Sequence, residues 1–134
     1  MTGPNTARAK PVILVVDDDQ NVTATLARIL RDDAIVLLAN DGEAGLNIVT
    51  AHRDIDLLVL DVTMPQYDAL ELLDDMKKCG KFLPLVLFSG WRRDVLDDVA
   101  KLAEHYGFQV RAVLEKPVDG SQIVRALNHQ SVRR

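Results

Sequence analysis

The chain has 134 residues, close to the modal size of one domain; 48% are hydrophobic but only 4% aromatic, which predicts a single aliphatic core. The formal net charge of −4 argues against a general nucleic-acid or membrane-surface binder, and the single cysteine excludes a disulfide framework. No apolar run approaches the roughly 18 residues of a membrane-spanning helix, and there is no hydrophobic signal core, so we expect a soluble, cytoplasmic protein that contacts neither nucleic acid nor membrane directly.

Apolar runs and helical stripes alternate along the chain after a polar leader over residues 1–10. The apolar runs predict strands over residues 12–16, 35–39, 57–61, 85–89 and 110–114, each typical of a strand covered on both faces. A stripe with helical spacing follows each run, most clearly over about 69–79 and 95–106. This alternation predicts a doubly wound parallel α/β domain over residues 11–130, with a short tail over 131–134.

Several helix ends carry residues that suit caps. Asn21 can cap the first helix, and we also expect Asp19, at the end of an acidic run, to act as a cap. Gly80 suits the C-cap of the helix before it, and Asp119 begins a segment with capping-box spacing. Gly107 can end the long helix that precedes the last strand.

Polar side chains of distinct kinds stand where the predicted strands end. Asp17 and Asp18 follow the first strand, Asp61 ends the third, Ser89 ends the fourth and Lys116 follows the fifth. Because the carboxyl ends of parallel strands meet at one edge of the sheet, we expect these groups to converge. Three carboxylates held together repel one another unless a cation is present. An oxygen-only set of ligands favours magnesium.

A lysine and a hydroxyl beside such carboxylates form a cradle for phosphoryl oxygens. The lysine acts as a point charge and the hydroxyl as a hydrogen-bond donor. A carboxylate so placed can itself attack a phosphoryl group and carry it as an aspartyl phosphate. Acceptance of a phosphoryl group is therefore the chemistry that these strand ends predict.

Four segments in chain order resemble the receiver domain of two-component response regulators, and the resemblance covers about residues 12–128. The segments are Val15 to Asp19, Leu60 to Asp68, Leu87 to Gly90 and Leu114 to Pro117. The resemblance implies a CheY-like, flavodoxin-like sheet of order 2-1-3-4-5. It also implies a signalling switch, not a metabolic enzyme, phosphorylated by a sensor histidine kinase or a phosphotransfer protein and able to form a homodimer on phosphorylation.

The resemblance also assigns roles to individual residues. Asp61 would be the phosphoacceptor, and Ser89 and Lys116 would contact phosphoryl oxygens. Mg²⁺ would be held directly by Asp18 and the Asp61 carboxylate, and by Asp17 mainly through a bound water. The remaining protein ligand would be the backbone carbonyl of Thr63. Pro117 matches the family's Lys-Pro junction, often a cis bond, which aims the lysine.

Departures from the family pattern concern the route from the site to its output. Val113 stands where the family usually has an aromatic residue, so the usual inward turn of an aromatic ring cannot operate. Ala69 replaces a common glycine. The segment from Ser89 to Lys116 is a few residues longer than in the common receiver. The stretch from Ser89 to Pro117 looks like receivers attached to EAL-type cyclic di-GMP phosphodiesterases, which suggests an output domain or effector in cyclic di-GMP turnover. We also hypothesise that Trp91 and Thr63 shield the acyl phosphate from water.

Two other functions fit parts of the pattern. A phosphatase resembling the haloacid dehalogenase superfamily would use Asp17 as its nucleophile, with Asp17 and Asp19 in its opening motif. Against it, no acidic pair follows Lys116 and there is no cap segment. A pseudo-receiver would bind partners without phosphorylation, and Val113 leaves open how strongly phosphorylation couples to output.

Overall fold

The computed structural model describes residues 10–64, 69–90 and 93–128. Its strands are β1 (Val12–Val16), β2 (Ile35–Ala39), β3 (Leu57–Asp61), β4 (Leu85–Ser89) and β5 (Val110–Glu115). Its helices are α2 (Gln20–Leu30), α3 (Gly42–Ala51), α4 (Ala69–Lys78), α5 (Arg93–Tyr106) and α6 (Gly120–Asn128). The predicted alternation is confirmed, and among the strands only β5 differs, by one additional residue. In the described ranges no helix is long and apolar enough to cross a bilayer.

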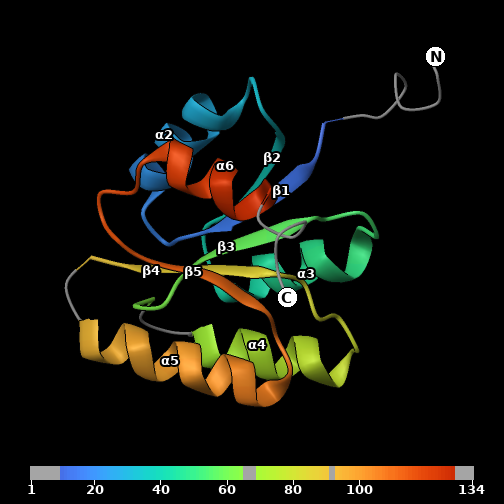
Figure 1. Cartoon of the computed structure of the whole chain (residues 1–134). Coiled ribbons are helices and arrows are strands. Elements are labelled where there is room, and N and C mark those ends of the chain that lie inside the picture. The colour runs from blue at the N-terminus through green and yellow to red at the C-terminus, as the bar shows by residue number, and fades with distance from the viewer. Residues whose placement is uncertain (1–9, 65–68, 91–92, 129–134) are drawn as a thin grey trace.

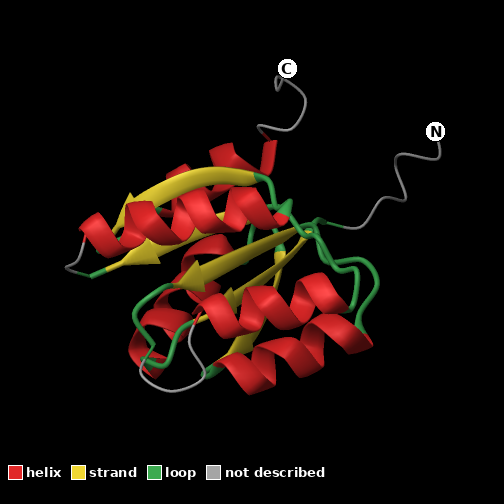
Figure 2. Cartoon of the chain, turned by 90° about the horizontal axis from the view of Figure 1, so that it is seen from below, coloured by secondary structure: helices red, strands yellow, loops and turns green. Residues whose placement is uncertain are grey.

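The strands form one parallel sheet in the order β2-β1-β3-β4-β5, which confirms the predicted fold. Helices α2 and α6 cover one face, and α4 and α5 lie on the opposite face with α3 (Figure 1). Every residue of β3 and β4 is buried, because these central strands have neighbours on both sides and helices on both faces. Figure 2 shows the same layers from below, with helices on either side of the twisted sheet.

The caps decide where the helices begin and end. Asp19 is the N-cap of α2, and its Oδ1 accepts the backbone N–H of Asn21 at 2.8 Å. The prediction that Asn21 is the cap is therefore wrong, because Asp19 has extended backbone and Asn21 already lies in the first helical turn. Asp119 caps α6 as predicted, since its Oδ1 accepts the N–H of Ser121 while Gln122 reaches back to the N–H of Asp119.

The two glycines expected at helix ends adopt left-handed backbone. Gly80, after α4, has φ of 74°, and Gly107, after α5, has φ of 108°. A side chain would strain the backbone at either position, which is why glycine terminates these helices so readily. Both turns return the chain to the amino end of the next strand. All the strands therefore point the same way and end at one edge.

Candidate phosphoryl-transfer site

The predicted site residues converge at the carboxyl edge of the sheet. Asp17 follows β1 with no exposed surface, while Asp61 on β3 and Ser89 on β4 are each 1% exposed. Backbone hydrogen bonds continue the sheet pattern to its edge: the N–H of Asp17 donates to Ala39 O at 3.1 Å, and that of Lys116 to Ser89 O at 2.9 Å. Each functional group is thus held by a rigid strand end.

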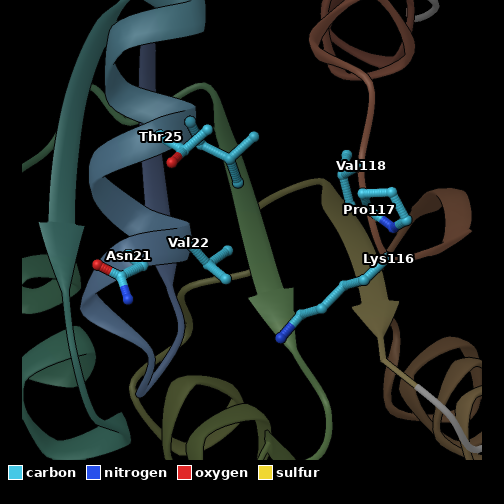
Figure 3. A pocket seen from close by; sticks show the side chains of 7 residues that line it. Asn21, Val22, Thr25, Lys116, Pro117 and Val118 are labelled. Atoms are coloured by element: carbon cyan, nitrogen blue, oxygen red, sulfur yellow. The ribbon is translucent and has the colours of Figure 1, made fainter.

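Lys116 reaches across this edge to two carboxylates. Its Nζ lies 2.8 Å from Asp17 Oδ2 and 3.4 Å from Asp61 Oδ2. Figure 3 shows the extended side chain running from the end of β5 toward the end of β3, beside a cavity of about 400 Å³. The Lys116–Pro117 peptide bond is cis, in agreement with the family junction that the sequence suggested.

The acidic groups form a cluster whose chemistry fits a hard cation. One carboxylate oxygen from each of Asp17, Asp18 and Asp61 lies within 4.8 Å of the others, and Asp18 is exposed while the other two are buried. Oδ2 of Asp17 is buried, and the ammonium of Lys116 lies 2.8 Å from it as an ion pair. Three carboxylates that offer only oxygen atoms at such short separations are suited to bind a hard divalent cation. The residues present therefore fit Mg²⁺.

Burial and mutual charge shift the pKa values in this cluster. Burial raises the pKa of Asp17 from 3.8 to about 6, although Lys116 and the backbone N–H of Asp19 act in the opposite direction, and the charge of Asp61 adds to the rise. Burial lowers the pKa of Lys116, but its contacts with Asp17 and Asp61 together outweigh that effect and raise it. The site thus favours the charged form of Lys116 and disfavours the ionised form of Asp17.

Thr63 orients the carboxylate of Asp61. Its backbone N–H donates to Asp61 Oδ1 at 3.0 Å, and its hydroxyl Oγ1 donates to the same oxygen at 2.8 Å. Both contacts leave Oδ2 on the side of Lys116. The expected role of the Thr63 carbonyl as a ligand to Mg²⁺ stays a prediction. Trp91, which we expect to shield the acyl phosphate together with Thr63, lies outside the described residues.

Two supporting residues were not anticipated from the sequence. The Asn40 side chain, after β2, donates to the backbone oxygen of Asp17 at 3.0 Å and to Thr23 Oγ1 at 3.2 Å. Thr23 is only 2% exposed on α2. These bonds tie the acidic loop after β1 to its neighbours. The sequence signal that points to Asn40 is its place directly after β2, the strand that pairs with β1.

A parallel sheet of this order, with a buried carboxylate, further acidic groups, a lysine and a hydroxyl at its carboxyl edge, defines the receiver class of signalling domains. The chain belongs to the response regulator receiver domain family, whose model matches residues 13–128. This assignment confirms the resemblance seen in the four sequence segments. It gives no support to the haloacid dehalogenase alternative.

Similar proteins agree with the assignment. Response regulator MprA of Mycobacterium avium is 41% identical over 91 residues, which cover 67% of this chain and 39% of that protein. The MprA of Mycobacterium leprae is 42% identical over the same shares. The chain thus matches about two fifths of the length of these curated relatives.

Solved structures show the same fold. A response regulator receiver domain protein from Clostridium thermocellum is 28% identical, with a TM-score of 0.76 over 89% of this chain and 92% of that one. FixJ-N is 23% identical with a TM-score of 0.76, covering 95% and 98% of the two chains. Receiver domains are signalling switches that histidine kinases phosphorylate and that bind Mg²⁺ at their acidic pocket. The proposed link to EAL-type phosphodiesterases stays a prediction.

Proposed function

We propose that this chain accepts a phosphoryl group on Asp61 from a histidine kinase or a phosphotransfer protein, in a reaction that requires Mg²⁺. The observation that supports this most directly is the position of Lys116, whose ammonium lies between the carboxylates of Asp17 and Asp61. A cation fixed there meets the negative charge of an incoming phosphoryl group. Oδ2 of Asp61 faces this ammonium from the end of a buried strand, so a phosphoryl group on Asp61 would lie beside the cation.

The reaction needs only positioning and charge stabilisation from the protein. A carboxylate oxygen of Asp61 attacks phosphorus, the bond from phosphorus to the donor histidine breaks, and its electron pair returns to the imidazole. Thr63 holds Asp61 Oδ1 during the attack, while Lys116 and Ser89 bind phosphoryl oxygens. Asp18, Asp61, the carbonyl of Thr63 and, mainly through water, Asp17 would hold Mg²⁺, which would supply charge neutralisation for the phosphoryl group.

Phosphorylation would then change partner contacts through a two-state element of the domain. The chain matches about two fifths of the length of its curated relatives. We propose that the receiver extends over residues 11–130 and acts in the cytoplasm. Its target would be an output domain or effector, with cyclic di-GMP turnover as one such output. A homodimer formed on phosphorylation is a second route to output.

Incubation with acetyl phosphate and Mg²⁺, followed by intact mass measurement, tests the acceptor. We expect the wild type to gain the mass of one phosphoryl group. The gain should be absent in Asp61→Asn and in the presence of EDTA, and it should occur more slowly in Asp17→Asn. Phosphorylation of Asp61→Asn at the wild-type rate would contradict the proposal.

Beryllofluoride with Mg²⁺ tests the switch separately. Unchanged amide resonances and an unchanged oligomeric state would favour the pseudo-receiver.

A further inference from the structure

Phe88 is an aromatic residue in a core cluster that is otherwise aliphatic. It is fully buried on β4, directly before Ser89. In the described part of the chain it is the one aromatic residue of the cluster between the sheet and helices α2 and α6, where the other members are Ile, Leu, Val and Ala. Its register partners are Asp61 on β3 and Leu114 on β5. The ring therefore stems from the strand that separates the acceptor from the lysine.

The ring of Phe88 lies beneath the ammonium of Lys116. The Nζ atom is 5.1 Å from the ring centroid, within the range of a cation–π contact. The same Nζ contacts Asp17 and Asp61, and only 23% of the Lys116 side chain is exposed. The ammonium of this largely buried side chain is thus surrounded by two carboxylates and an aromatic face.

We infer that Phe88 is a positioning residue for Lys116, an inference that rests on the proposed phosphoryl transfer to Asp61. The lysine must cross the end of β4 to reach β3, as Figure 3 shows, and its flexible stem has many rotamers. The aromatic face of Phe88, on the strand between them, attracts the ammonium, where an aliphatic side chain of similar size offers no such attraction. Phe88 thereby holds the cation ready for the phosphoryl oxygens.

Phosphorylation rates with acetyl phosphate and Mg²⁺, followed by intact mass, test this role. We expect Phe88→Leu to slow phosphorylation of Asp61 by about three- to tenfold, the range of a partly desolvated cation–π contact. Phe108→Leu is the matched control, because Phe108 is also buried, 4% exposed, but packs on Phe82 near the start of β5. We expect it to phosphorylate at the wild-type rate.

A double-mutant cycle and a spectroscopic signal separate positioning from packing. In a Lys116→Met background, Phe88→Leu should have no further effect on the rate. The ε-methylene protons of Lys116 should lose their aromatic shielding in Phe88→Leu and keep it in Phe108→Leu. Where Phe88→Leu fails to fold, mono-, di- and trifluorophenylalanine placed at position 88 keep the ring size and weaken its negative face, so the rate should fall stepwise.

Three results would overturn the inference: a wild-type rate in Phe88→Leu, an equal loss in the Lys116→Met background, or a rate independent of fluorination. These results are distinct from failure of the proposed function, in which wild-type protein gains no phosphoryl group or Asp61→Asn gains it equally. The wild-type and Asp61→Asn samples are therefore measured in the same series.

Discussion

The ammonium of Lys116 lies closer to Asp17, at 2.8 Å, than to Asp61, at 3.4 Å. The lysine therefore pairs most closely with the carboxylate that is completely buried. That pairing only partly offsets the burial of Asp17, since the pKa of Asp17 is still raised to about 6. The site consequently contains a carboxylate whose ionisation opposes folding.

Asp17→Asn should therefore stabilise the protein in EDTA at neutral pH, by about 1 to 2 kcal/mol in the free energy of unfolding. The raised pKa means that the folded state binds the proton of Asp17 more tightly than the unfolded state does. The stabilisation of the folded state by protonated Asp17 is complete below pH 3.8 and is lost as the pH rises through about 6. The difference between the variants should follow that pH range in denaturant titrations.

Asp18→Asn is the control for this experiment, because Asp18 is exposed and belongs to the same acidic cluster. Both substitutions should reduce the rise in unfolding temperature that Mg²⁺ produces in the wild type. Only Asp17→Asn should stabilise the metal-free protein. If Asp17→Asn lowered stability in EDTA at neutral pH, the buried carboxylate would be a net stabilising group and the argument from desolvation would be wrong.

Gly120 allows α6 to begin directly against α2. A Cβ on this glycine would collide with Cγ2 of Ile29. We expect Gly120→Ala to lower the free energy of unfolding by about 1 to 3 kcal/mol, through overpacking. Ile29 is 47% exposed, so Ile29→Ala alone should have a small effect. The double variant Gly120→Ala, Ile29→Ala should recover most of the lost free energy of unfolding. If the loss persisted in the double variant, its cause would be the backbone of α6 and not the contact with Ile29.

Arg111 on β5 binds the carboxyl end of α6. Its Nη1 donates to the carbonyl oxygens of Ala126 at 3.1 Å and Leu127 at 3.3 Å. A cation at this end of a helix is favourable because the last carbonyls lack partners and carry partial negative charge. Arg111→Met should lower stability by about 0.5 to 1.5 kcal/mol and speed amide exchange in the last turn of α6. The exposed Arg125→Met should do neither.

Val113 leaves room where an aromatic residue was expected. It is half-buried on β5 and lines a groove of about 470 Å³ together with α5. Val113→Phe should therefore change the free energy of unfolding by less than about 1 kcal/mol, because the ring can extend into the groove. Val86→Phe, in a fully buried position on β4, should be destabilised by about 2 kcal/mol or more. Equal losses would mean that the groove is closed to a ring.

Strand ends were predictable from local pattern wherever burial was complete. The runs that became β3 and β4 have helices on both faces and neighbours on both sides, so each side chain had to be apolar until the functional residue. The cap of α2 was less predictable, because Asp19 and Asn21 are both good capping residues. Backbone direction at the turn after β1, extended at Asp19, selected between them.

The sequence alone determined the alternation of strands and helices and the kinds of group at each strand end, because these follow from periodicity and from the chemistry of single residues. Only the tertiary structure decided the distances: that Lys116 pairs most closely with Asp17, that Asn40 supports the acidic loop, and that Phe88 lies beneath the lysine. These contacts join residues far apart in the chain. They depend on strand order and register, which no local pattern specifies.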